Sequence, residues 1–203
     1  QRGHLRLVID HDEIGHAALI PTGPEAGRIV LWTRDNLLNS QQTPGHYNSW
    51  IYDPTAQTVV PLPFPTIPEV PGLYNPFCSG HSWLKDGSLL LVGGGADTGH
   101  QGSDGSKQVH RLLTDVGGVV AWTDEPPDLP PYPPEDVAHR YYPSVISVND
   151  DANQLTEAVV IGGTSSALTG DCAGLGNHQF ERWLTLDDPT PSGVWIDHQD
   201  PAN

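Results

Sequence analysis

The sequence contains no methionine, only nine lysine and arginine residues, and no apolar run long enough for a transmembrane helix. It carries 25 aspartate and glutamate residues, so its formal net charge is −16. Binding to nucleic acid or to an anionic membrane requires clustered Lys and Arg, and the composition therefore argues against both partners. We expect no membrane insertion. An acidic surface keeps a secreted protein soluble, and we expect an extracellular or cell-surface location.

Two further features of secreted chains are scarce or missing. No Asn-x-Ser/Thr acceptor for glycosylation occurs. The chain starts at Gln1 without a signal sequence, which fits a mature chain whose leader has been removed or a piece of a longer protein. There are only two cysteines, Cys78 and Cys172, which permit one disulfide bond.

Long stretches with apolar residues at helical spacing are also missing. Glycine (22) and proline (20) together make up more than a fifth of the chain and separate short apolar runs. Examples are 28–32, 88–92 and 158–161. Many short strands joined by tight or ordered loops produce this pattern, so the sequence predicts an all-β fold.

An internal repeat organises these strands. Four apolar segments recur three times, with a period of roughly 60 to 70 residues, and glycines follow the second segment in two repeats, at Gly93–Gly95 and Gly162–Gly163. Glycines allow neighbouring backbones to approach where strands converge. We predict three four-stranded blades of a kelch-like β-propeller, at approximately residues 12–63, 76–125 and 138–198. A β-sandwich of about a dozen strands is the alternative.

Three blades do not close a propeller, because closed propellers have four to eight. We therefore interpret residues 1–203 as a single, partial propeller domain. The open sheet edges should be covered by the remaining blades, on a C-terminal segment or a separate chain. The proline-rich stretch 125–135 is predicted to connect the second blade to the third. The glycine-rich surroundings of Asp104 indicate a loop.

Four stretches of the chain, 16–21, 77–87, 140–144 and 177–183, carry a resemblance to a known family. They include Phe-Cys-Ser-Gly-His-Ser-Trp and Arg-Tyr-Tyr-Pro-Ser, and each of these two is followed by a Gly-Gly pair. They resemble motifs of the copper radical oxidases, meaning galactose oxidase and especially glyoxal oxidase and its bacterial relatives. The resemblance implies a galactose oxidase-type, seven-bladed propeller of which this chain is the N-terminal part.

By position, Cys78 and Tyr142 match the cofactor residues of that family. The resemblance implies that the Cys78 sulfur is joined to the ring of Tyr142, and that this thioether-tyrosine ligates one copper ion and forms a stable radical. It also implies the oxidation of a small alcohol, aldehyde or carbohydrate by O₂, which becomes H₂O₂. The metal–radical pair supplies the chemistry, and the protein positions and tunes it.

The sequence also departs from that family. The remaining copper ligands, a second Tyr followed by His and a further His, do not occur in these 203 residues, so activity requires the missing blades. Residues 164–166 are Thr-Ser-Ser where galactose oxidase has a shielding Trp. A non-catalytic propeller that serves as a structural or interaction module is the alternative function.

Other roles for individual residues remain open. Cys78 can pair with Cys172 as an ordinary disulfide, and Tyr142 can be a plain core residue. Arg140 is expected to bond to carbonyls near the start of a strand. His16 and His81 hold equivalent repeat positions, which favours packing or backbone hydrogen bonding over metal ligation.

Overall fold

The structure, a computed structural model, is made of strands throughout the part of the chain that it describes. It describes residues 14–33, 49–63, 74–96, 104–105, 108–116, 119–123, 129, 140, 142–150, 155–163, 180–186 and 194–197. These residues form thirteen strands and no helix. The predicted all-β class is therefore confirmed.

The strands form three antiparallel sheets, each built from consecutive strands. The first sheet contains β1 (Ile14–Leu19), β2 (Ile29–Thr33), β3 (Ser49–Asp53) and β4 (Thr58–Pro61). The second contains β5 (Tyr74–Trp83), β6 (Leu89–Ala96), β8 (Val109–Val116) and β9 (Val119–Thr123). The third contains β10 (Ser144–Asp150), β11 (Leu155–Ile161), β12 (Phe180–Leu186) and β13 (Val194–Asp197). Each sheet therefore coincides with one predicted repeat.

The second sheet has one strand more than the repeat predicts. The short strand β7 (Asp104–Gly105) pairs antiparallel with Gly95 and Ala96 at the end of β6. The prediction of a loop at Asp104 is wrong at these two residues. Backbone pairing with the extended end of β6 outweighs the low strand propensity of Asp and Gly.

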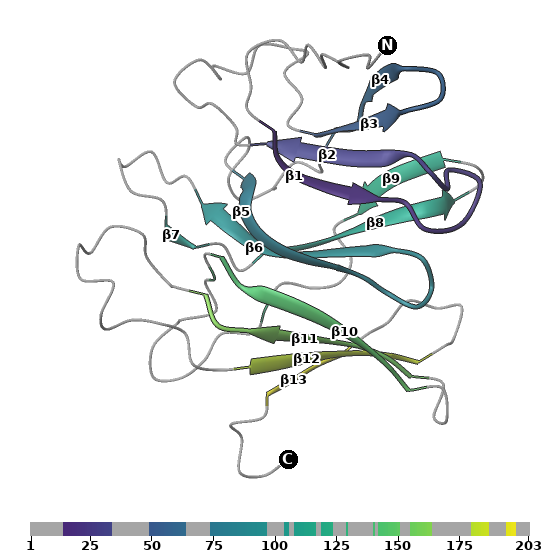
Figure 1. The fold of residues 1–203 in the computed structure, drawn as a ribbon. Coiled ribbons are helices and arrows are strands. Elements are labelled where there is room, and N and C mark those ends of the chain that lie inside the picture. Colours follow the sequence, from purple (N-terminus) through teal and green to yellow (C-terminus); the bar gives the residue numbers. More distant parts are fainter. Residues whose placement is uncertain are drawn as a thin grey trace, which may run out of the picture.

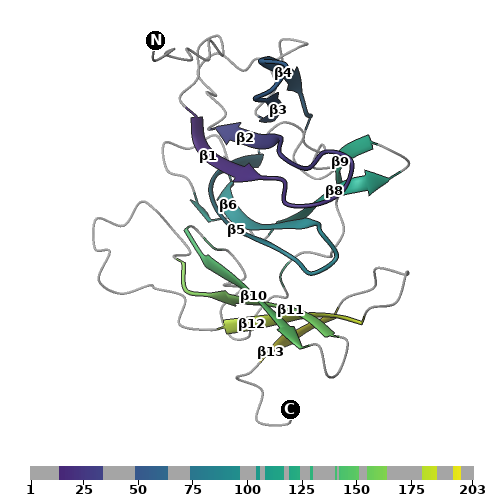
Figure 2. The same ribbon diagram turned by 45° about the vertical axis from the view of Figure 1, so that its right-hand side comes forward.

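The three sheets are stacked in sequence order (Figures 1 and 2). Successive residues of β6 point to opposite faces of the middle sheet, so Leu91 belongs to the core shared with the first sheet and Leu90 to the core shared with the third. The first core also contains Trp32 of β2, and the second contains Val160 of β11. The middle sheet is therefore buried on both faces, which differs from a sandwich of two sheets.

The third sheet has an apolar face on the side away from the second. Val145 packs into the shared core, whereas Ile146 and Val148 of β10 and Ile161 of β11 are 49%, 44% and 43% exposed. Strands that are apolar on both faces are typical of sheets covered on both sides. We define these three exposed residues as the outer apolar face.

Buried polar contacts fix the turn between β5 and β6. The carboxylate of Asp86 accepts hydrogen bonds from the backbone N–H and the hydroxyl of Ser88, at 2.9 and 2.6 Å. Arg111 of β8 donates to the Ser88 hydroxyl at 2.7 Å and forms an ion pair with Asp86. The Arg111 side chain is largely buried, and its ion pair with Asp86 connects the turn between β5 and β6 to strand β8.

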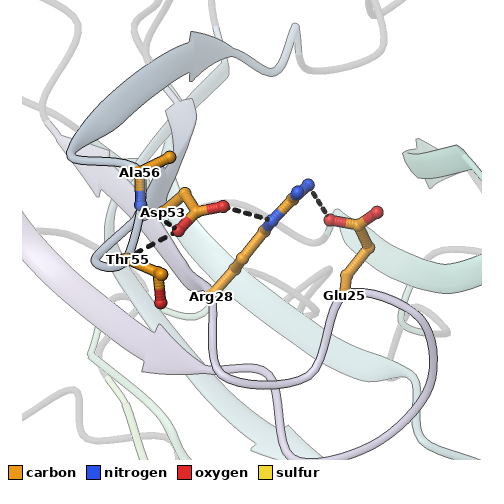
Figure 3. A network of polar contacts seen from close by, with 5 residues as sticks. All are labelled: Glu25, Arg28, Asp53, Thr55 and Ala56. Carbon is orange, nitrogen blue, oxygen red and sulfur yellow. Dashed lines mark hydrogen bonds and ion pairs between the residues drawn. The ribbon is translucent and has the colours of Figure 1, made fainter.

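A related but more exposed network lies in the first sheet (Figure 3). Arg28 donates to Asp53 at 3.2 Å and also contacts Glu25 in the turn between β1 and β2. The backbone N–H groups of Ala56 and Thr55 donate to Asp53 at 2.9 and 2.8 Å. The Ala56 bond above all, with smaller contributions from Thr55 and Arg28, lowers the pKa of Asp53. An exposed network of this kind orients the turns but contributes little stability.

Burial of the middle sheet on both faces leads to a first prediction. Leu90→Ala and Leu91→Ala should each lower the free energy of unfolding by about 2–5 kcal/mol, because both side chains are fully buried, on opposite faces. The control is Leu19→Ala, since Leu19 is exposed and its truncation should cost less than about 0.5 kcal/mol. Urea unfolding of the complete protein measures all three changes. A small effect for either β6 leucine would contradict the three-layer arrangement.

Candidate functional site

Cys78 and Tyr142 hold equivalent positions in the second and third sheets. In the second sheet Gly80, two residues after Cys78, pairs with Val92, the last residue before the glycines that end β6. In the third sheet Ser144, two residues after Tyr142, pairs with Ile161, the last residue before Gly162. The pairing register thus gives the same correspondence as the sequence repeat.

The structure brings the two residues together through their backbones. The backbone N–H of Tyr142 donates a hydrogen bond to the carbonyl oxygen of Cys78, with an N···O distance of 2.8 Å. This bond joins the start of the third repeat to the first strand of the second sheet. The only two residues that the family resemblance implicates in cofactor formation therefore lie at one junction between sheets.

The side chains of the pair differ in exposure. Cys78, which forms no disulfide within the described part of the chain, is 1% exposed, whereas Tyr142 is 58% exposed. The alternative in which Tyr142 is an ordinary core residue is therefore wrong. The disulfide alternative involves Cys172, which lies outside the described residues.

The backbone of Tyr142 adopts a left-handed conformation, with φ of 55°. A residue with a Cβ is disfavoured there by about 1–2 kcal/mol, so the surrounding contacts must hold it. Gln57, the other described non-glycine residue with positive φ, lies in the turn between β3 and β4, where such values are common. Tyr142 instead lies in a bend two residues before β10 begins at Ser144.

Arg140 connects the two sheets beside this tyrosine. It is completely buried, its guanidinium donates to the carbonyl of Gly162, and its own carbonyl accepts a hydrogen bond from the N–H of Gly94 at 3.0 Å. The expectation that Arg140 bonds to a carbonyl is confirmed, but the carbonyl belongs to Gly162, directly after the end of β11. Gly94 belongs to the second sheet and Gly162 follows β11 of the third, so Arg140 bridges the sheets.

Two glycines allow this close approach. A Cβ at Gly93 would lie 2.5 Å from the carbonyl oxygen of Arg140, and a Cβ at Gly80 would lie 2.3 Å from that of Pro143. The prediction that the glycines after the second strand let neighbouring backbones approach is confirmed at Gly93. Gly162 has free space around its Cβ position, and its φ of 70° explains the glycine there.

The sequence analysis did not identify the contact between Gly80 and Pro143. One signal was available, because Gly-His occurs in the first strand of two successive repeats, at Gly15 and Gly80. A Cβ at Gly15 would lie 2.4 Å from the ring of Phe77. Glycine therefore marks close sheet-to-sheet contact on both sides of the second sheet.

His16 and His81 lie against aromatic rings at the junction of the first and second sheets. The ring of His16 stacks on Trp32 with a centroid distance of 5.2 Å, and its Nε2 atom contacts the carbonyl oxygen of Phe77. His81 meets Trp32 edge to face at 4.8 Å. Burial, followed by the proximity of His16, lowers the pKa of His81. The predicted packing and backbone hydrogen bonding are confirmed for His16, and His81 packs in the same cluster.

The described residues offer only part of a copper site. Within these ranges, no group of three or more His, Cys, Asp or Glu residues is placed to hold a metal ion. Tyr142 is exposed and Cys78 is buried, and a backbone hydrogen bond joins the two residues. In residue type this pair matches the cysteine and tyrosine of the implied site, and further ligands would have to come from elsewhere.

Comparisons with known proteins do not assign the chain to a family. No family model matches it, and no curated protein matches it. Among the described residues, no helix is long and apolar enough to cross a membrane. Fold and geometry therefore carry the functional argument.

The buried histidine of β8 leads to a second prediction. Burial lowers the pKa of His110 to about 4, although a backbone hydrogen bond involving Thr123 opposes the shift. The unfolded chain then takes up a proton near pH 6.5 and the folded chain only near pH 4. Stability should fall as the pH drops from 6.5 to 4, by at most about 3 kcal/mol, and this contribution should be constant outside that window.

The variant His110→Gln isolates this contribution, because its side chain stays neutral while every other titrating group is retained. Free energies of unfolding in urea, measured from pH 4 to pH 7, should show a weaker pH dependence for the variant. Parallel profiles for the two proteins would show that His110 does not titrate as its burial requires.

Proposed function

We propose that this chain is part of an extracellular copper radical oxidase-like β-propeller that oxidises an alcohol or aldehyde with O₂ and produces H₂O₂. The observation that carries the proposal is the backbone bond between Cys78 and Tyr142, which occupy equivalent positions in two neighbouring sheets. These are the two residues that match the thioether cofactor of the family. A buried cysteine and an exposed tyrosine that are bonded through their backbones support the formation of such a cofactor.

The stacking of the sheets supports the propeller in this proposal. Adjacent blades of a propeller pack face to face around an axis, and the middle sheet here is buried on both faces. In our proposal residues 1–203 form three blades of a kelch-like, seven-bladed wheel. The outer apolar face of the third sheet would pack against the next blade, on a C-terminal segment or a separate chain.

In this proposal the chain contributes the residues of the cofactor and their placement. Formation of the thioether joins the Cys78 sulfur to the Tyr142 ring carbon beside the hydroxyl. The thiol hydrogen and the ring hydrogen leave, and O₂ accepts the two electrons and two protons as H₂O₂. Copper bound to the Tyr142 oxygen, when present, would supply the one-electron partner for oxidation of a small alcohol, aldehyde or carbohydrate.

A non-catalytic propeller is the second candidate. It is favoured by Thr-Ser-Ser at 164–166, where galactose oxidase has a Trp against the radical tyrosine. The two candidates differ in what the rest of the polypeptide must contain. A Tyr-His pair and a later His in further blades would favour the oxidase.

The thioether provides the third prediction. In protein purified with copper present, peptide mapping after full reduction and alkylation should find the Cys78 and Tyr142 peptides linked. Their joint mass should be lower by two hydrogens than the sum of the separate peptides. The bond survives reduction, which distinguishes it from a disulfide between Cys78 and Cys172.

Tyr142→Phe serves as the control, because a ring without the hydroxyl does not couple, and its Cys78 should be alkylated. If Cys78 of the unaltered protein is alkylated on an unmodified peptide, the oxidase proposal fails and the non-catalytic propeller is favoured.

The outer apolar face provides the fourth prediction. Residues 1–203 expressed alone should aggregate or fold poorly, because this face and the sheet edges stay exposed. Val148→Thr, on the exposed face, should raise the soluble fraction of this isolated chain. The matched change Val145→Thr, on the face packed into the shared core, should not. A sharp, cooperative thermal melt of the isolated chain as a soluble monomer would contradict the need for further blades.

A further inference from the structure

The junction between the second and third sheets contains a buried charged residue that the proposed chemistry does not use. Arg140 is 0% exposed and lies two residues before Tyr142. A buried guanidinium is retained only where its hydrogen bonds are well satisfied. The contacts of the buried Arg140 side chain therefore indicate what the residue does at this junction.

Arg140 makes contacts on both sides of the junction. Its carbonyl oxygen accepts from Gly94 at 3.0 Å, which fixes the chain to the end of β6. Its guanidinium donates to the carbonyl of Gly162, which fixes the side chain to the residue after β11. Two residues later, the N–H of Tyr142 bonds to Cys78 of β5. The segment that carries Tyr142 is thus attached to β5, to β6 and to the end of β11.

These attachments explain the left-handed backbone of Tyr142. Between the bonds at Arg140 and Tyr142 the chain must turn sharply before β10 begins at Ser144. The carbonyl of Pro143 lies against Gly80 at a separation that excludes a Cβ there. With backbone contacts before and after it, Tyr142 cannot relax to a negative φ unless one of them breaks.

We propose that Arg140 is the positioning residue of the Cys78–Tyr142 pair. It holds the ends of the two sheets together so that Tyr142 stays in its left-handed conformation, with its backbone bonded to Cys78. The catalytic consequence rests on the proposed function, because it concerns formation of the thioether. The conformational consequence does not depend on copper or on any reaction.

The principal test is Arg140→Lys in the complete protein purified with copper present. Lysine keeps the charge but lacks the planar fork of guanidinium donors, so its hold on the sheet ends is weakened. The thioether-linked fraction should form about tenfold to a hundredfold more slowly, because small displacements of reacting groups have effects of this size. Amide hydrogen exchange at Tyr142 should accelerate selectively relative to the other amides of β5 and β10.

A second variant moves Arg140 without altering it. Gly93→Ala places a Cβ 2.5 Å from the Arg140 carbonyl oxygen, at φ of 71°. Gly27→Ala is the matched control, because Gly27 has φ of 89° but nothing within 4 Å of its Cβ position. Both variants carry the cost of a left-handed alanine, and only Gly93→Ala should slow thioether formation and speed exchange at Tyr142.

The outcomes distinguish this proposal from the proposed function. If the unaltered protein forms no thioether, the oxidase proposal fails, and selective exchange at Tyr142 in the variants alone decides the role of Arg140. If Arg140→Lys does not fold, the comparison of Gly93→Ala with Gly27→Ala decides it. The positioning role would be overturned if Arg140→Lys changed neither the rate of thioether formation nor amide exchange at Tyr142. It would also be overturned if Gly93→Ala and Gly27→Ala slowed thioether formation equally.

Discussion

The close approach of the second sheet to the third is the constraint on which the arrangement of the site depends. At Gly80 and Gly93 the neighbouring carbonyl oxygens of Pro143 and Arg140 occupy the space that a Cβ would need. Any side chain at these two positions would push the second and third sheets apart at this junction. The bond between Tyr142 and Cys78 spans the same junction, so it depends on these glycines as directly as on the residues that form it.

The middle sheet stabilises its neighbours by an apolar core on each face, and polar contacts determine how the strand ends are placed. Leu89 and Leu91 bury one face and Leu90 and Val92 the other, all at 0% exposure. Apolar contact is not directional and does not specify a register by itself. The ion pair of Arg111 with Asp86 adds direction, since it attaches the turn after β5 to β8. Apolar burial thus favours the stacking of the three sheets, and the polar contacts at turns and sheet junctions favour one placement of the strand ends.

The sequence predicted the strands and their grouping because those depend on local pattern. Apolar runs bounded by Gly and Pro, repeated three times, were enough to predict an all-β chain with four-stranded sheets. The strand β7 was not predicted, because pairing with β6 and not local propensity makes Asp104 and Gly105 extended. Cys78 and Tyr142 were predicted as candidates from the resemblance to the copper radical oxidases, but their opposite exposure depends on packing between sheets and has no local signal.

The contrast between a buried sulfur and an exposed phenol is compatible with one reactive pair. At 58% exposure, a substantial part of the Tyr142 side chain is still covered. The backbone bond to Cys78 fixes the position at which that side chain leaves the chain. The left-handed backbone of Tyr142 lies between the bonds of Arg140 on one side and the contact of Pro143 with Gly80 on the other, so the junction holds this residue from both sides.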